Sequence, residues 1–135
     1  MDLTKALSIS ASGMDAQGAR LRVIAENLAN QDTTGSRPGG APYRRKTVTF
    51  ADAMDRKAGT RLVTVASVGE DPSAFPLRYD PSNPAANAQG YVKLPNVNSF
   101  IEMMDMRDAE RSYDANLSVM QATRSMLTRT IDLLK

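Results

Sequence analysis

Apolar residues recur at every seventh position near both ends of the chain, whereas the stretch between the ends lacks this spacing. The two rows are Leu7, Met14, Leu21 and Leu28 near the start, and Met106, Tyr113, Met120, Leu127 and Leu134 near the end, widened by Leu117 and Ile131. Because a helix turns once in about 3.6 residues, positions seven apart lie along one narrow face. The pattern therefore predicts a long helix at each end, with a row suited to packing against another helix.

The first helix is expected over residues 3–30 and the second over residues 96–135. No glycine or proline occurs from Asn96 onward, so the second helix can extend for ~60 Å. Gly13 and Gly18 weaken the first helix, and they indicate that another helix approaches closely there. The candidate N-terminal caps are Asp2 or Thr4 for the first helix, and Asn96, Asn98 or a Ser99–Glu102 capping box for the second.

All seven prolines lie between residues 31 and 95, where the heptad spacing is absent. Residues 33–42 have loop chemistry, and 52–57 suggest a helical turn. Alternating or β-branched segments predict short strands over 46–50, 61–68, 75–79 and 90–94. This region has little apolar surface to bury by itself, so we expect parts of it to be mobile until a partner covers them.

The predicted fold is mainly α with a small β-rich insert, in which the two terminal helices pack as an antiparallel coiled-coil pair. In domain terms, residues 1–30 and 96–135 together form an inner coiled-coil domain, and 31–95 form a connector loop and a small β-rich middle module. One helix pair covers each apolar row only in part, which favours association with further copies. The alternative is a self-contained two-helix monomer with a β insert.

Charge is spread unevenly over the chain, whose formal net charge is only +2. Residues 37–61 contain seven basic side chains against Asp52 and Asp55. This basic segment is either a solvated surface or a surface for an anionic partner, such as an acidic patch on a neighbouring subunit. Tyr43 and Phe50 are its only aromatics and no nucleic-acid motif frames it, so nucleic acid is not an expected partner.

The residue types needed for most catalytic and metal chemistry are missing. The chain has no His and no Cys, which removes the commonest general base, thiol nucleophiles and most metal ligands. The acidic residues at 102–110 alternate with Arg107 and Arg111, a spacing typical of a solvated ion-pair face. The segment 80–87 has too few carboxylates for a calcium loop. The sequence therefore predicts no enzyme, cofactor, metal or small-molecule substrate.

Two further features bear on location and partners. The first thirty residues lack the basic start and unbroken apolar block of a cleaved signal peptide, and no stretch is apolar enough to span a bilayer. The methionines at 103, 104 and 106 suggest either adaptable filler for a helix interface or a promiscuous peptide groove. We interpret them as interface filler.

Four segments, namely residues 29–35, 39–46, 79–84 with 90–98, and 102–106, together resemble the flagellar basal-body rod proteins over nearly the whole chain. The first, residues 29–35 (ANQDTTG), is similar to the Ala-Asn-x-x-Thr-x-Gly motif that rod and hook proteins share after their first helix. The others are 39–46 (GGAPYRRK), 79–84 (YDPSNP) with 90–98, and 102–106 (EMMDM) with the helix that follows. The spacing between the first two segments is closest to the proximal-rod type. Thr34 and Asn83 depart from the residues most common in the family.

The resemblance implies a structural subunit rather than an enzyme. It implies that the paired terminal helices form the inner layer of a hollow helical tube, that the middle module forms an outer layer, and that the subunit polymerises with itself and with other rod proteins. It also implies export by the flagellar type III apparatus without a cleaved signal, a rod that crosses the periplasm and transmits torque, and contacts with the membrane ring and export gate.

These expectations name two sets of residues. The assembly seam is Leu7, Met14, Leu21, Leu28, Met106, Tyr113, Leu117, Met120, Leu127, Ile131 and Leu134. The inter-subunit connector is centred on Asn30, Thr33, Gly35, Tyr43, Arg44 and Arg45. Two alternatives from other functional classes stay open at this point, namely a free coiled-coil adaptor or secretion chaperone, and a small carboxylate enzyme.

Overall fold

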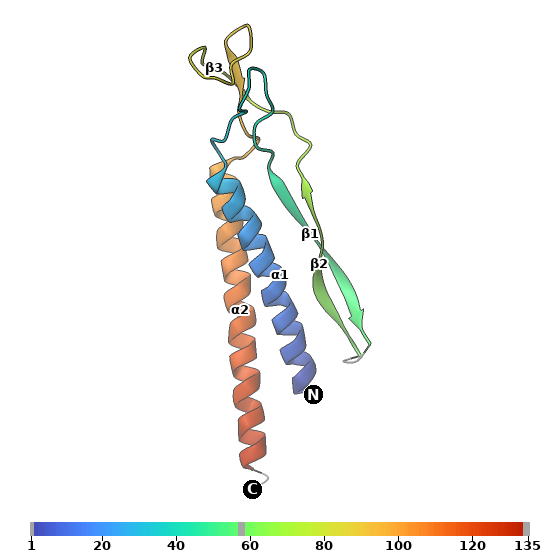
Figure 1. The fold of residues 1–135 in the computed structure, drawn as a ribbon. Coiled ribbons are helices and arrows are strands. Elements are labelled where there is room, and N and C mark those ends of the chain that lie inside the picture. The colour runs from blue at the N-terminus through green and yellow to red at the C-terminus, as the bar shows by residue number, and fades with distance from the viewer. Residues whose placement is uncertain (1, 57–58, 134–135) are drawn as a thin grey trace. The chain divides into compact units, whose positions relative to one another are not determined.

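The computed structural model describes residues 2–56 and 59–133 and has two long helices, with two small sheets formed by the chain that connects them (Figure 1). In chain order the elements are α1 (Leu3–Ala29), β1 (Lys46–Asp55), β2 (Thr60–Glu70), β3 (Leu77–Tyr79), β4 (Tyr91–Lys93) and α2 (Ser99–Asp132). Leu134, the last residue of the predicted seam, lies outside the described residues. The predicted class, mainly α with a small β-rich insert, is confirmed.

All four predicted strands are present, and they form two separate two-stranded sheets, β1–β2 and β3–β4. The helical turn expected over 52–57 is wrong for the residues described, because Asp52–Asp55 continue strand β1. Ala51 and Ala53 are neutral to poor strand formers, and pairing with β2 overrides that local preference. Thr64 donates a hydrogen bond from its hydroxyl to the Ala51 carbonyl at 3.4 Å, which ties the two strands there.

Each helix begins at a side-chain cap. Asp2 accepts the backbone N–H of Thr4 at 3.2 Å, so it caps α1. Asn98 accepts the backbone N–H groups of Phe100 and Ile101 at 3.0 and 3.4 Å, so it caps α2. These are two of the predicted alternatives; the Ser99–Glu102 capping box is not formed, because the Glu102 side chain is buried in other contacts.

The chain divides into two compact units, each of which contains part of both helices. The first unit comprises the chain up to Leu21, Val48–Ser67, and the chain from Met106 onward. Its most buried side chains are small: Ser10, Ala16, Ala109 and Thr123. A Cβ atom at Gly13 would lie 2.8 Å from the side-chain nitrogen of Asn116, so any larger residue at this position requires the Asn116 side chain to shift. A Cβ atom at Gly18 would meet no atom within 4 Å. The expectation that another helix approaches closely at Gly18 is therefore wrong within a single chain.

The second unit comprises Arg22–Thr47 and Val68–Asp105. Its buried apolar residues are Val23, Ile24, Ala85 and Val92. Strands β3 and β4 pair antiparallel with Arg78 opposite Val92 and Tyr79 opposite Tyr91. Val92 is fully buried, whereas Tyr79 and Tyr91 are exposed on the other face and pack edge to face at 5.3 Å.

Helices α1 and α2 run antiparallel, as predicted. In the first unit Gly13 lies against Asn116, and in the second Asn27 bonds Glu102. On α2 the covered residues recur at every seventh position: Glu102, Ala109 and Thr123 are buried, and Asn116 is half-buried. This covered row on α2 is small or polar rather than strongly apolar.

Candidate assembly site

A fully bonded asparagine lies at the centre of a polar cluster in the second unit. Asn27 is in the last turns of α1 and is 1% exposed. Its amide nitrogen donates to the Lys46 carbonyl at 2.9 Å and to Glu102 Oε2 at 3.1 Å. Its oxygen accepts the Lys46 backbone N–H at 2.8 Å and the Tyr43 hydroxyl at 2.9 Å. Both donors and both acceptor positions of the amide are therefore used, which offsets the cost of burying it.

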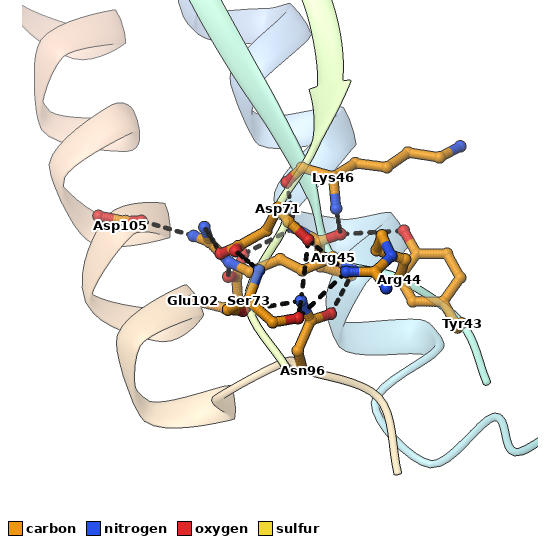
Figure 2. A network of polar contacts seen from close by, with 10 residues as sticks. Tyr43, Arg44, Arg45, Lys46, Asp71, Ser73, Asn96, Glu102 and Asp105 are labelled. Atoms are coloured by element: carbon orange, nitrogen blue, oxygen red, sulfur yellow. Dashed lines mark hydrogen bonds and ion pairs between the residues drawn. The ribbon is translucent and has the colours of Figure 1, made fainter. Parts of the chain in front are cut away.

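The Asn27 cluster also contains a buried ion pair (Figure 2). Glu102, in the first turn of α2, is 1% exposed, and its Oε1 accepts a hydrogen bond from Arg45 Nε. The same guanidinium lies 3.5 Å from an Asp71 carboxylate oxygen and 3.6 Å from one of Asp105. Burial by itself lowers the pKa of Arg45, but the hydrogen bond and the charge of Glu102 outweigh this effect. The pKa of Arg45 is therefore raised, and its guanidinium stays protonated.

We refer to Asn27, Tyr43, Arg45, Lys46 and Glu102 as the polar junction. It joins three segments that are distant in sequence: the end of α1, the start of β1 and the start of α2. Because the interior is a poor solvent for ions, a junction of this kind is stable only when every partner is in place. It therefore favours one pairing of the two helices in this unit over shifted alternatives.

The segment after β2 is tied to the polar junction through main-chain groups. Asn96 accepts the backbone N–H of Arg45 at 2.8 Å and donates to the Ser73 hydroxyl at 2.9 Å. Arg44 donates to the carbonyl oxygens of Asp71 and Ser73 at 2.8 and 3.1 Å. The Arg44 guanidinium also lies 4.1 Å from the centre of the Phe75 ring, a cation–π contact.

The connector folds back on itself between α1 and β1. The Tyr43 N–H donates to the Thr33 carbonyl at 3.0 Å, which closes the loop. Inside it, the Gly40 N–H donates to the Arg37 carbonyl at 2.8 Å. A Cβ atom at Gly35 would lie 2.8 Å from the Gly40 backbone, and backbone cannot swing aside as a side chain can. Glycine at position 35 is therefore required for this closed loop.

The predicted connector residues are engaged within the chain itself. Asn30 donates from its side chain to the Glu26 carbonyl at 2.9 Å and accepts the Thr33 hydroxyl at 3.2 Å, which closes the end of α1. Tyr43 and Arg45 belong to the polar junction, and Arg44 binds residues 71–75. Contacts of these side chains with neighbouring subunits remain a prediction.

The residues of the predicted assembly seam flank the small and polar row described above. All of those within the described chain are half-buried except Ile131, which is 55% exposed. On α2, the residues Met106, Tyr113, Met120 and Leu127 each lie four positions after a residue of the covered row, so they occupy a neighbouring face. Part of the apolar surface of each seam residue within residues 2–133 thus remains open in a single chain.

The buried pair of Glu102 and Arg45 was missed in the sequence, where Glu102 was assigned to a solvated ion-pair face. That assignment is wrong for Glu102. The signal that distinguishes it is its context, a single carboxylate between Ile101 and Met103 with Phe100 and Met104 beyond. Its partner Arg45 lies 57 residues away, and no local pattern connects the two.

Within residues 2–56 and 59–133, no group of three His, Cys, Asp or Glu side chains is placed to hold a metal ion. Neither helix there combines the length and the apolar character that crossing a bilayer requires. The contacts that the structure shows at the site are one buried ion pair, a set of side-chain to backbone hydrogen bonds, and partly open apolar rows.

The stability of the fold should depend on pH in the alkaline range, because the polar junction includes the Tyr43 hydroxyl. Burial, together with the negative charge of Glu26, raises the pKa of Tyr43 above its ordinary value near 10. Stability linked to this hydroxyl is therefore fully present below pH 10 and is lost as pH rises through the folded-state pKa. We expect unfolding above pH 10 to accompany a rise in tyrosinate absorbance at 295 nm. Tyr43→Phe should remove that component of the alkaline transition, and an identical pH profile in the variant would contradict the assignment.

Two family models match the chain. Residues 7–36 match the model described as "Flagella basal body rod protein", and residues 88–133 match "Flagellar basal body rod FlgEFG protein C-terminal". The first matched range contains Asn27 and all four seam residues of α1, and the second contains Glu102 and the six seam residues of α2.

Similar proteins cover the chain almost from end to end. A protein of Agrobacterium fabrum is 53% identical over 98% of this chain and 96% of its own length. One from Escherichia coli O6:H1 is 43% identical over 98% of both, and one from Bacillus subtilis is 40% identical over 94% of this chain and 95% of its own length. Each of the three is named flagellar basal-body rod protein FlgC.

Proposed function

The chain belongs to the FlgC family of flagellar basal-body rod proteins, and from this premise we propose that it is a structural subunit of the proximal rod that acts by packing against other subunits. The observation that carries the proposal is the placement of its apolar surface. The covered row on α2 is small and polar, and the half-buried seam residues lie beside it. The similar proteins are named as structural rod components, and they give no support to a free adaptor or chaperone.

We assign the two ends of the chain to an inner helical layer. Residues 1–30 and 96–135 form the inner coiled-coil domain of this proposal, and residues 31–95 form the connector and an outer module. Burying a Leu or Ile side chain contributes roughly 1.5–3 kcal/mol, so covering the open part of each seam by neighbouring helices stabilises the assembly over the free chain. Torque is then carried by many lateral contacts that resist shear together.

The finer placement of the subunit follows from the same proposal. Its partners are further copies of itself, other rod proteins, and at the proximal end the membrane ring and export gate. The rod crosses the periplasm, and the subunit reaches it through the flagellar export apparatus without a cleaved signal. The inner helices line the channel through which later axial proteins pass.

Leu127→Asp tests the proposal directly. Leu127 is a half-buried seam residue near the end of α2. A charge there should block incorporation into basal bodies and abolish swimming, because an unpaired carboxylate is costly to bury between helices. Secretion of the subunit should persist, since a chain that is exported unfolded does not use its packing surface. Incorporation is measured by immunoblot of isolated basal bodies, and secretion by immunoblot of the medium of a strain unable to build the rod.

The matched control is Thr128→Asp, which adds the same charge at the next position, on an exposed side chain of α2. It should incorporate at close to the normal level. Normal swimming of the Leu127→Asp strain would overturn the seam assignment. If the unaltered protein is absent from isolated basal bodies and instead forms a small soluble oligomer, the rod proposal itself fails and an adaptor is favoured.

A further inference from the structure

The first two turns of α2 have ions on the inner side and apolar side chains on the outer side. Glu102 is buried against Arg45, and Asp105 also lies toward that guanidinium. The neighbouring large side chains face outward: Phe100 is 72% exposed, Ile101 49%, Met103 54% and Met104 55%. A surface helix normally has the opposite arrangement, with its apolar stripe toward the core and charges toward water. We call these four residues the outer apolar patch.

The polar junction does not use the side chains of the outer apolar patch. The polar contacts of this turn are made by Glu102 and by the Asn98 cap, and none involves the four outer side chains. Isolated exposed apolar residues are common on protein surfaces, but four large ones within five positions form a contiguous surface. Such a surface marks a contact with something other than water.

A membrane is the less suitable occupant. Helices that bind lipid surfaces combine an apolar face with a strongly basic polar face. The exposed charges that follow the outer apolar patch balance, with Arg107 and Arg111 positive and Asp108 and Glu110 negative, so they offer no net attraction to anionic lipid. Methionine pairs with flexible, polarisable side chains are instead suited to packing against another helix.

The area of the patch indicates how it is used. Four large side chains at about half exposure offer on the order of 400 Å², whereas each partner of a standard stable interface contributes about 800 Å². The outer apolar patch is therefore too small to hold a dimer in dilute solution by itself. It is suited to a contact that is repeated within an assembly and supported there by other contacts.

We propose that the outer apolar patch docks the apolar face of a helix on an adjacent rod subunit, a second contact surface distinct from the seam and on the opposite side of α2 from the polar junction. This inference rests on the proposed function. The ion pair on the inner side allows it: because Glu102 and Asp105 satisfy Arg45 inside the unit, the outer side of the same turns is free to be wholly apolar. Phe100 is the anchor, since it is the most exposed aromatic side chain of α2 and aromatic residues dominate interface energetics.

Charge insertion tests the patch. Phe100→Glu and Met104→Glu should each lower incorporation into basal bodies by about tenfold or more, because both place a carboxylate at the centre of the contact. The control is Ser118→Glu, which lies two heptads after Met104 on the same outer face of α2 and is exposed. It should incorporate within about twofold of the unaltered protein. Hydrogen exchange at the Lys46 amide, which bonds to Asn27, should be unchanged in all three if the junction is intact.

A cross-link identifies the occupant. The chain has no cysteine, so Met104→Cys creates a single attachment point for a photoactivated cross-linker in intact basal bodies. A cross-linked peptide from a helix of this chain or of another rod subunit supports the proposal. A product with lipid or with a ring protein, or no product in rods that contain the variant, overturns it. Normal incorporation of Phe100→Glu and Met104→Glu overturns it while leaving the rod function intact, whereas absence of the unaltered chain from basal bodies overturns both.

Discussion

Replacing Asn27 by aspartate should destabilise the second unit by about 3–5 kcal/mol, although the two side chains have nearly the same shape. The Asn27 amide nitrogen donates to Glu102 Oε2 and to the Lys46 carbonyl, at 3.1 and 2.9 Å. In Asn27→Asp an oxygen with negative charge takes its place and faces two acceptors, one of them a buried carboxylate. Urea unfolding of the purified chain measures the loss, and exchange of the Lys46 amide reports it locally.

The control for this substitution is the same change at the start of α2. Asn98 accepts the backbone N–H groups of Phe100 and Ile101, and aspartate accepts them equally well. A negative charge at a helix N-terminus is also favourable, so Asn98→Asp should change the free energy of unfolding by no more than about 1 kcal/mol, in the stabilising direction. Equal effects of the two substitutions would show that the polar junction does not hold the unit together.

The second large effect is a strong coupling between Arg45 and Glu102. Glu102→Met leaves the Arg45 guanidinium with only the two longer contacts, to Asp71 and Asp105. Arg45→Met leaves the Glu102 carboxylate buried with Asn27 as its remaining partner. Arg45→Met should cost about 3–5 kcal/mol, because it leaves the Glu102 carboxylate buried without a cation. Glu102→Met should cost less, because the half-buried Arg45 keeps Asp71 and Asp105.

The double variant should be less destabilised than the two single changes together, because it removes both charges and fills the site with apolar side chains of similar length. We expect a coupling free energy of about 2 kcal/mol or more from the four urea transitions. Arg107→Met and Glu110→Met, on exposed positions of the same helix, form the control cycle and should be additive. Additive costs at Arg45 and Glu102 would contradict the buried ion pair.

The heptad rows predicted the two helices but not the face on which they meet. Leu7, Met14 and Leu21 on α1 are half-buried, whereas Ser10 and Ala16 are buried. A sequence pattern reports which side chains avoid water in the final assembly. It does not distinguish those covered by the same chain from those left for another chain, because both kinds are apolar and share the same spacing.

In the connector, too, the sequence shows the local features, whereas the tertiary structure decides the long-range contacts. Its loop composition, its glycine at position 35 and its tyrosine at position 43 are evident in the sequence. The closing hydrogen bond from Tyr43 to Thr33, and the bond from the Tyr43 hydroxyl to Asn27, depend on how the chain returns to the end of α1. Such long-range pairs have no periodic signal.

By itself, the sequence determined the two terminal helices, the positions of the short strands, the absence of His and Cys chemistry, and a family resemblance that the similar proteins confirm. These properties depend on local propensity, periodic spacing and residue types, all of which can be observed along one dimension. Only the tertiary structure decided that Glu102 faces inward to Arg45 and Asn27, while Phe100 and Met104 face outward. The physical reason is that burial of a charge becomes favourable only when its partners converge from distant segments, and that convergence is a property of the folded chain.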